Sequence, residues 1–436
     1  LMVRNLSEVD HYSSDFQQLQ GLNDDNWVFP IRGHAMETFT GIGLPTTRKG
    51  NEKWKYTNVA PIARLPFALS GPSNTSVKVI KSVAPWSDSW TNVVFVNGLY
   101  RKDLSDRSND FELTNLAELI EERIPVEELG SLTNISDDGF AALNTSFLQD
   151  GIVLRVGQGK TVEFPINVVF FSDGTPSTVA HPRIFVKAGR GSSVSIIESY
   201  VGGGGDYSLT NSVSEVLVEE DAVVNHYRFL SESEHTYDVG YGRVKLSNNS
   251  VFNSRSFFKG ASIGRYDLNV LVDGEYASCD LQGLYFTSGE QHMDNFINID
   301  HAKPYGTSNL FYKGILDGKS RAVFGGTVLV RKPAQKTDSV QSDKNLILSA
   351  DAEIDSKPAL FIYADDVKCA HGATAGNVDA DTLFYMRSRG IDLETASRLL
   401  IYGFAGEVID KVEIPELRDF LEEAFLTSLP SYRFEF

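Results

Sequence analysis

Between about residues 150 and 370, short runs of alternating apolar and polar residues follow one another, and helical periodicity is nearly absent. A period of two residues is the pattern of β-strands, so this stretch predicts a long all-β block. Four of its turns resemble one another, at a spacing of roughly thirty residues where the match is best. They are KAGRGSSVSI (187–196), VEEDAVVNHY (218–227), VDGEYASCDL (272–281) and LSADAEIDSK (348–357).

This loose repeat favours a β-solenoid, in which each coil buries its inner face by stacking on its neighbours. A β-sandwich and a β-propeller are the competing folds. No Trp-Asp or similar blade signature recurs, and Trp27, Trp54, Trp86 and Trp90 all precede the β block. The tryptophan pattern counts against the propeller.

The first 150 residues predict a mixed α/β region. NVVFVNGLY (92–100) predicts a strand, and LTNLAELIEERI (113–124) predicts a helix with Leu113, Leu116 and Ile120 on one face. The segment 43–62 is bounded by Pro and Gly and contains an aromatic-basic cluster, WKY (54–56). We interpret this segment as a packed turn that joins domains, with a binding site as the alternative.

Helical periodicity returns after residue 378. Asp379 and Asp392 are expected N-caps, Gly390 is expected to end the first helix, and Pro415 is expected to open the third. The apolar face of the second helix consists of Leu393, Ala396, Leu400, Phe404 and Val408. This face either closes the end of the solenoid or docks another protein. The chain thus divides into an N-terminal mixed helical region (1–149), a β-helix core (150–378) and a C-terminal helical domain (379–436).

The chain is strongly acidic, with a formal net charge of -18 over 436 residues. Affinity for nucleic acid or an anionic membrane needs a basic surface, so neither is an expected partner. No apolar run approaches the roughly 20 residues that span a bilayer, and the first residues lack the apolar core of a signal peptide. We therefore expect a cytoplasmic protein.

Nucleotide chemistry is not expected in this chain. ILDGKS (315–320) ends like a phosphate-binding loop, but Lys313 stands where that loop needs its first glycine. The histidines also lack the H-E-x-x-H spacing of a helical metal site. A carboxylate pair of a glycosidase or lyase would become visible only in three dimensions.

A cysteine and a histidine lie two positions apart in ADDVKCAHGATAG (364–376). If residues 360–371 form one extended strand, Asp365, Cys369 and His371 project to the same side. Each could then offer one ligand to a metal site that is completed elsewhere, because two cysteines cannot build a four-thiolate site. Spacing alone favours the alternative of a packed core pair, and Cys279 is expected to be a core residue.

Residues 343–396, which include this motif, resemble the most distinctive segment of the SufD side of the SufB/SufD family. Members of this family are scaffold subunits of the SUF iron-sulfur cluster assembly machinery. The similarity continues through 318–346, 140–156 and 52–62, and it covers nearly the whole chain.

The resemblance implies a right-handed parallel β-helix that pairs with the paralogue SufB. It also implies C-terminal helices that dock SufC, an ABC-type ATPase, so that no nucleotide is bound by this chain. His371 matches the family's interface histidine, which is implicated with a SufB cysteine in forming a transient iron-sulfur cluster, and Cys369 matches the neighbouring cysteine. These two residues are therefore the expected metal-site residues of a non-catalytic scaffold subunit.

Two alternatives are a stand-alone β-helix carbohydrate lyase or hydrolase and a purely structural partner of SufB. A homodimer is possible when SufB is absent, and a plant or algal source would place the protein in the plastid stroma.

Overall fold

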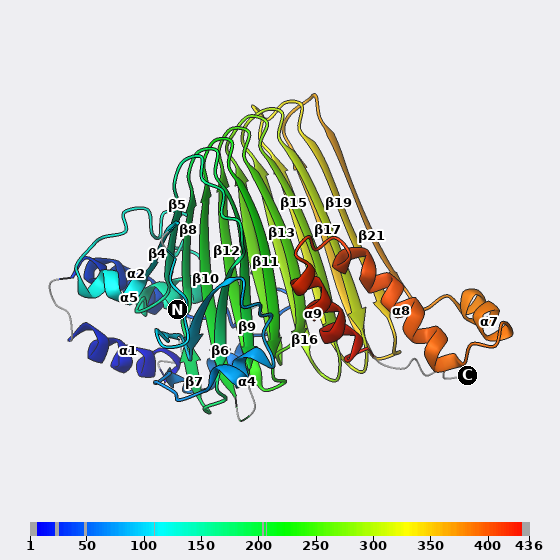
Figure 1. Ribbon diagram of the computed structural model, residues 1–436, viewed down its shortest axis with the longest axis horizontal. Helices are drawn as coiled ribbons and strands as arrows, with labels where there is room; N and C mark the ends of the chain where they lie inside the picture. Colours follow the sequence, from blue (N-terminus) through cyan, green and yellow to red (C-terminus); the bar gives the residue numbers. More distant parts are fainter. Residues whose placement is uncertain are drawn as a thin grey trace.

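The computed structural model describes residues 7–21, 26–47, 50–108, 110–202, 205 and 207–429. The predicted first and last domains also include residues 1–6 and 430–436, which lie outside this description. The described strands form two long sheets (Figure 1), and from β8 to β21 every successive strand lies in the other sheet. The strand pairings along the solenoid are all parallel, and the chain makes about eight coils. The predicted parallel β-solenoid is therefore confirmed.

The strand bounds of the two sheets are as follows. Sheet A contains β1 (Ala68–Leu69), β4 (Glu112–Asn115), β5 (Ile152–Val156), β7 (Thr178–Ala180), β8 (Arg183–Ala188), β10 (Ser208–Val218), β12 (Thr236–Leu246), β14 (Ile263–Val272), β16 (His292–His301), β18 (Arg321–Val330) and β20 (Glu353–Ile362). Sheet B contains β2 (Thr91–Val96), β3 (Leu99–Tyr100), β6 (Ile166–Ser172), β9 (Ser193–Gly202), β11 (Val223–Glu232), β13 (Val251–Gly260), β15 (Ser278–Thr287), β17 (Thr307–Leu316), β19 (Asp338–Ile347) and β21 (Lys368–Gly376).

The main hydrophobic core lies between the two sheets and runs along the solenoid. Alternate residues of each strand point into it, because successive side chains of a strand project to opposite faces. Cys279 is one of these core residues, as the sequence predicts. Each coil buries its inner face against its neighbours, so the stacking of coils is the main source of stability.

The repeated turns lie at a corner where the chain passes from sheet A to sheet B. Left-handed residues recur there at intervals of 27 to 31 residues, and they are Asp221, Asn249, Tyr276, Tyr305 and Lys336. The backbone N–H of each donates to a carbonyl of the following coil, for example from Asp221 to Asn248 at 3.0 Å. Three of the four turns found in the sequence lie at this corner, whereas the fourth, 348–357, belongs to the opposite corner.

The N-terminal region covers part of the outer face of sheet A with a second apolar cluster. Its helices are α1 (Ser7–Gln20), α2 (Val28–Ile42), α3 (Ala60–Ala63), α4 (Val77–Lys81), α5 (Leu116–Glu121) and α6 (Gly139–Ser146). The predicted single strand over 92–100 is wrong, since Asn97 and Gly98 form a left-handed turn that folds this run into a β2–β3 hairpin. The predicted helix over 113–124 is shorter, because Leu113 belongs to β4 and the Asn115 side chain caps α5.

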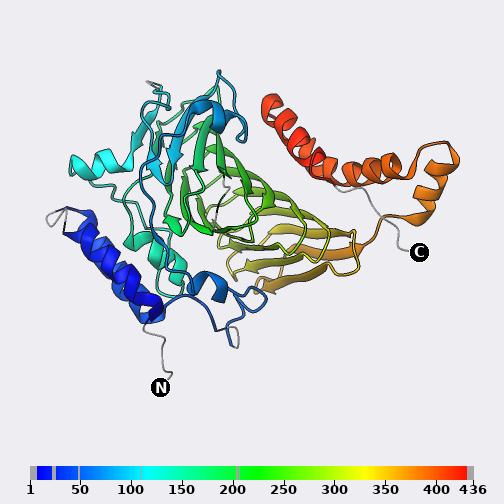
Figure 2. The same cartoon turned by 90° about the horizontal axis from the view of Figure 1, so that it is seen from below.

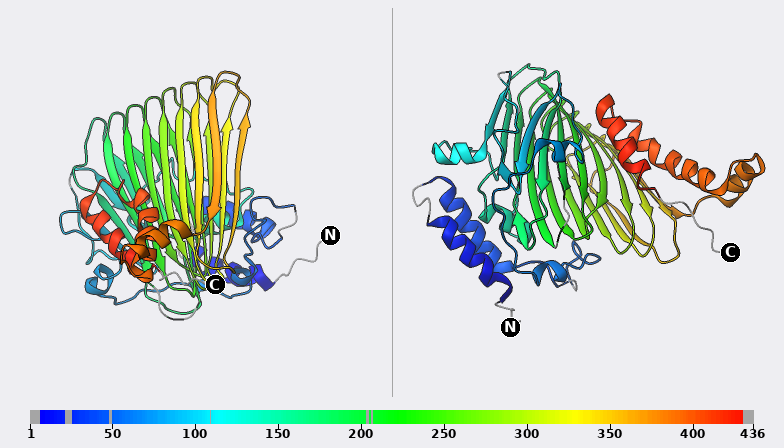
Figure 3. Two further views of the ribbon diagram at one scale, coloured as in Figure 1. Left: turned by 90° about the vertical axis from the view of Figure 1, so that its right-hand side faces the viewer. Right: turned by 60° about the horizontal axis from the view of Figure 1, so that its bottom comes forward.

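The C-terminal helices are α7 (Ala380–Ser388), α8 (Leu393–Ile409) and α9 (Pro415–Leu426). The predicted caps are confirmed, since Asp379 and Asp392 accept hydrogen bonds from backbone N–H groups in the first turns of α7 and α8. Helices α8 and α9 pack on the outer face of sheet B, and α7 reaches beyond the end of the solenoid (Figures 2 and 3). The buried residues of α8 are Ala396, Ser397, Ile401, Ala405, Gly406, Val408 and Ile409, so its buried face is rotated from the predicted one.

Candidate functional site

Cys369 and His371 both lie on β21, the last strand of sheet B. Strand β21 pairs with β19 in parallel, and the register places Cys369 beside Ser339 and His371 beside Gln341. Because residues two apart on a strand share a face, Cys369 and His371 both project toward the solenoid interior. Cys369 packs against the interior apolar cluster, whereas His371 is exposed at the open end of the solenoid.

Asp365 does not join this pair on one strand face. Strand β20 ends at Ile362 and β21 begins at Lys368, so Asp365 lies in the corner between the two strands. The neighbouring Asp366 accepts a hydrogen bond from the backbone N–H of Lys336, which keeps this corner in line with the preceding coil. The expectation of one extended strand across 360–371 is therefore wrong.

The environment of the two candidate ligands differs. Burial raises the pKa of the Cys369 thiol above its usual value, and the nearby Asp338 carboxylate raises it further. Since the thiolate is the metal-binding form, this shift works against metal binding at Cys369. His371 is exposed to incoming groups and can offer an imidazole nitrogen as a ligand.

The two cysteines lie in one inward column, which their sequence positions did not reveal. The column runs from Cys279 through Ser308 and Ser339 to Cys369. Ser308 donates a hydrogen bond to the Ser339 hydroxyl at 2.8 Å, so a pair of hydrogen-bonded serines lies between the two cysteines. With strands about 4.8 Å apart, the cysteines are too distant to ligate one ion together.

Gln341 on β19 supports the candidate site from the solenoid interior. Gln341, beside His371, is buried and donates a hydrogen bond from Nε2 to the Ala359 carbonyl of β20 at 3.3 Å. This contact joins the two sheets next to the candidate site. Within the described residues, no three His, Cys, Asp or Glu side chains are arranged so that they could hold a metal ion together.

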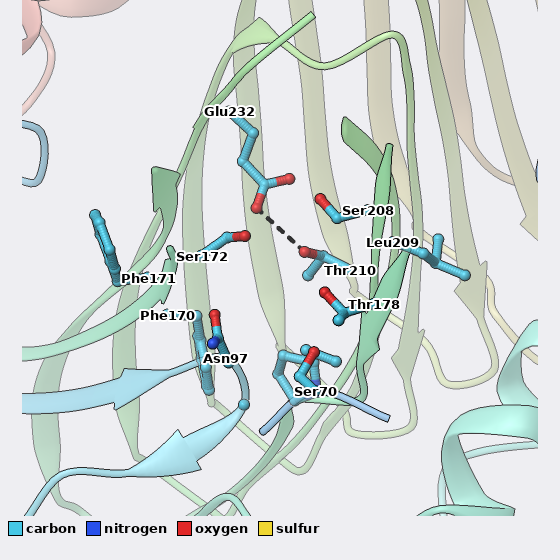
Figure 4. Close-up of a pocket in the computed structure, with 13 residues that line it drawn as sticks. Ser70, Asn97, Phe170, Phe171, Ser172, Thr178, Ser208, Leu209, Thr210 and Glu232 are labelled. Atoms are coloured by element: carbon cyan, nitrogen blue, oxygen red, sulfur yellow. Dashed lines mark hydrogen bonds between the residues drawn. The ribbon is translucent and has the colours of Figure 1, made fainter. Parts of the chain in front are cut away.

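A small polar cavity lies farther along the solenoid, near β6, β7 and β10 (Figure 4). Its volume is about 20 Å³, which is room for roughly one water molecule. Glu232 lines it and accepts a hydrogen bond from the Thr210 hydroxyl at 3.1 Å. Burial, reinforced by the charge of Asp238, raises the pKa of Glu232 well above its usual value. The cavity is too small for an organic substrate.

The segment GASIG (260–264) has the G-x-S-x-G spacing of a hydrolase nucleophile. It lies in the corner between β13 and β14, whereas a nucleophile elbow joins a strand to a helix. This segment therefore does not form the nucleophile elbow of a hydrolase. None of the helices in the described part of the chain has the length and apolar character needed to cross a bilayer.

Comparison with known families gives two matches that cover most of the chain. Residues 170–404 match the family described as "SUF system FeS cluster assembly, SufBD core domain", and residues 9–168 match the SufBD protein N-terminal region. The chain belongs to the SufBD family. Iron-sulfur cluster assembly is the process in which this SufBD protein takes part.

Relatives of this SufBD protein occur in bacteria and in a plant. An iron-sulfur cluster assembly SufBD family protein of Synechocystis sp. is 29% identical, with 97% of this chain and 98% of the relative covered. The chloroplastic protein ABCI7 of Arabidopsis thaliana is 31% identical, with 89% and 83% covered. The iron-sulfur cluster assembly protein SufD of Escherichia coli is 29% identical, with 87% and 88% covered.

Proposed function

We propose that this chain is a SufD-type, non-catalytic scaffold subunit of an iron-sulfur cluster assembly complex. It pairs with a SufB-type subunit, binds a SufC-type ATPase through its C-terminal helices, and contributes His371 to a nascent cluster at the SufB interface. The observation that carries the proposal is the position of His371, which is exposed on the last strand of an open solenoid end.

The open end supports pairing with another solenoid. Strands β20 and β21 each pair on one side only, among the described residues. Large apolar side chains are exposed on or next to these strands. They are Phe361 and Ile362 on β20, Tyr363 just after it, and Val340 on the neighbouring strand β19. A sheet edge with free backbone groups and apolar neighbours is a site for strand addition, so a second solenoid can continue both sheets.

The chemistry of the proposed site follows from the two side chains. His371 supplies an imidazole nitrogen, and the partner supplies a thiolate. Cys369 is the weaker candidate, because its raised thiol pKa keeps it protonated at neutral pH. Incomplete ligation by two chains suits a scaffold that must release its cluster.

The first test measures cluster formation by the reconstituted complex. His371→Ala is expected to reduce iron and sulfide bound per complex by about tenfold or more, and Cys369→Ser is expected to have a smaller effect. His235→Ala is the matched control, since His235 is also exposed but lies between β11 and β12. Wild-type cluster content in an intact His371→Ala complex would instead favour the purely structural role.

The C-terminal helices support the proposed ATPase contact. On α7, Phe384 is 75% exposed and Tyr385 is 57% exposed, although both are large apolar residues. Helices α8 and α9 are tied to sheet B by two buried or half-buried lysines. Lys313 donates to the Phe404 carbonyl and pairs with Glu407, and Lys259 donates to the Ala424 carbonyl at 2.9 Å. A pull on α7 would thus pass to the solenoid and its end.

The second test separates the two proposed partners. Phe384→Asp is expected to lose SufC in co-purification while SufB is retained, because a charge cannot be buried in an apolar contact without a large cost. Tyr363→Asp is expected to do the reverse, since Tyr363 lies beside the free strand edges and is 64% exposed. Each variant is the control for the other. Loss of both partners from either folded variant would contradict the separate surfaces.

We further propose the three-part division at residues 149 and 378, and a location in the bacterial cytoplasm or the plastid stroma. The bacterial and chloroplastic relatives support such a location.

A further inference from the structure

A second cavity, of about 280 Å³, lies on the outer face of sheet A. Its walls come from residues 52–56 of the N-terminal region and from strands β16, β18 and β20. One outward column of the sheet runs from Phe296 through Gly325 to Lys357. A Cβ atom at Gly325 would lie 2.9 Å from Cδ2 of Phe296, so only glycine leaves this hollow open without displacing the ring.

The cavity has aromatic walls. The Phe296 ring lies 4.8 Å from the guanidinium of Arg265, which itself lies 4.0 Å from the ring of the buried Trp54. Tyr56 and Phe361 also line the cavity. The stack of Trp54, Arg265 and Phe296 fixes one wall, and a flat aromatic ligand can stack on such a wall.

The charges around the cavity are paired with one another. The pairs are Lys53 with Asp138 at 2.6 Å and Asp267 at 3.3 Å, Lys357 with Glu52 at 2.6 Å, and Arg265 with Asp294. No unpaired charge of the described wall residues attracts an ion, so the lining favours an uncharged ligand.

One buried acceptor at the cavity wall lacks a donor. Asp294 is almost fully buried and lines the cavity, and its Oδ2 accepts hydrogen bonds from the Thr57 hydroxyl and from Arg265. Its Oδ1 has no hydrogen-bond partner among the described residues. This oxygen is itself shielded from solvent, so a group in the cavity does not reach it, and the contacts of Oδ2 hold the carboxylate within the wall.

We propose that this cavity binds an uncharged fused aromatic ring, of about the size of indole, as a free small molecule. The volume is near the lower end of the range for small-molecule sites, about 300–1,000 Å³. The Lys357–Glu52 ion pair links two walls of the cavity, which hinders entry of a ring that is attached to a polypeptide backbone. The proposal does not rest on the pairing with SufB or SufC.

The test titrates the full chain alone with indole and follows binding by saturation-transfer NMR. Saturable binding with a Kd below about 1 mM is expected. 1-Methylindole, which keeps the uncharged fused ring, is expected to bind about as tightly as indole. Indole-3-acetate, an anion, and N-acetyltryptophanamide, which carries a backbone, are expected to bind more weakly than indole.

Ala359→Phe is the variant that fills the cavity, because half-buried Ala359 lines it from β20. Val340→Phe is the matched control, since Val340 is an exposed outward position on β19 of the other sheet. Indole binding is expected to be lost in the first variant and unchanged in the second, with equal unfolding temperatures.

Three outcomes would overturn the proposal. These are no saturable binding of indole to the wild type, equal binding of indole to Ala359→Phe, and equal or tighter binding of the anion or the backbone-bearing ligand. Each is measured without SufB or SufC, so it is independent of the proposed scaffold role.

Discussion

At the scale of single residues, Asp343 is a buried carboxyl group close to the candidate site. It lies on β19 beside Ala373 of β21, and its Oδ2 accepts hydrogen bonds from Ser356 and Asn345, each at 2.7 Å. Burial raises its pKa to about 6 despite these two donors. The folded state therefore keeps this proton at pH values where the unfolded chain, in which the aspartate pKa is about 3.9, has lost it.

Asp343→Asn is expected to remove a pH-dependent loss of stability. In the wild type, the folded state binds more protons than the unfolded state between about pH 4 and pH 6, so the free energy of unfolding falls as the pH rises through this window. The asparagine variant should be more stable than the wild type at pH 8, by up to about 3 kcal/mol. Denaturant unfolding at pH 4 and pH 8 measures the difference.

The control for this prediction is Asp351→Asn, because Asp351 is an exposed carboxyl in the corner between β19 and β20. It should leave the pH dependence unchanged. If the free energy of unfolding fell between pH 4 and pH 6 by the same amount in Asp343→Asn as in the wild type, Asp343 would not be responsible for the pH dependence.

The candidate residues could be found from the sequence, but their setting could not. The spacing of Cys369 and His371 gives a shared strand face, and the structure confirms that face. The exposure of His371 depends on the absence of a further coil above β21 among the described strands, which no local pattern encodes. Gln341 is 30 positions away and became its neighbour only through the register of parallel strands.

At the scale of elements, local signals were reliable where a side chain caps or turns the backbone. Asp379, Asp392 and Pro415 mark their helix starts because their chemistry acts within one turn. The Asn97-Gly98 pair is also a local signal, in this case for a hairpin turn. The apolar run around it suggested one continuous strand instead. The buried face of α8 was predicted less well, since packing against sheet B, and not the helix itself, selects it.

At the scale of the whole molecule, the unequal ends of the solenoid are the main asymmetry. The N-terminal region covers part of the outer face of sheet A, and the C-terminal helices lie on the outer face of sheet B, where Figure 1 shows them in front of the strands. The edges of β20 and β21, by contrast, carry no further strand of the described chain. Free edges of parallel strands with apolar neighbours favour association with a second solenoid. When no SufB-type subunit is present, a second copy of this chain offers the same kind of edge.

The isolated chain is therefore expected to form a dimer that becomes tighter as salt is added. Two copies with a formal charge of -18 each repel one another, while the apolar contact around Tyr363 is insensitive to screening. The Debye length falls from about 14 Å at 0.05 M salt to about 4 Å at 0.5 M, so the repulsion weakens across this range. Sedimentation equilibrium at the two salt concentrations measures the change.

Tyr363→Asp should remain monomeric at both salt concentrations, whereas Phe384→Asp, on α7 and away from the strand edges, should dimerise like the wild type. A dimer that dissociates as salt is added would instead indicate an interface held by ion pairs, and an unchanged dimer in Tyr363→Asp would place it on another surface.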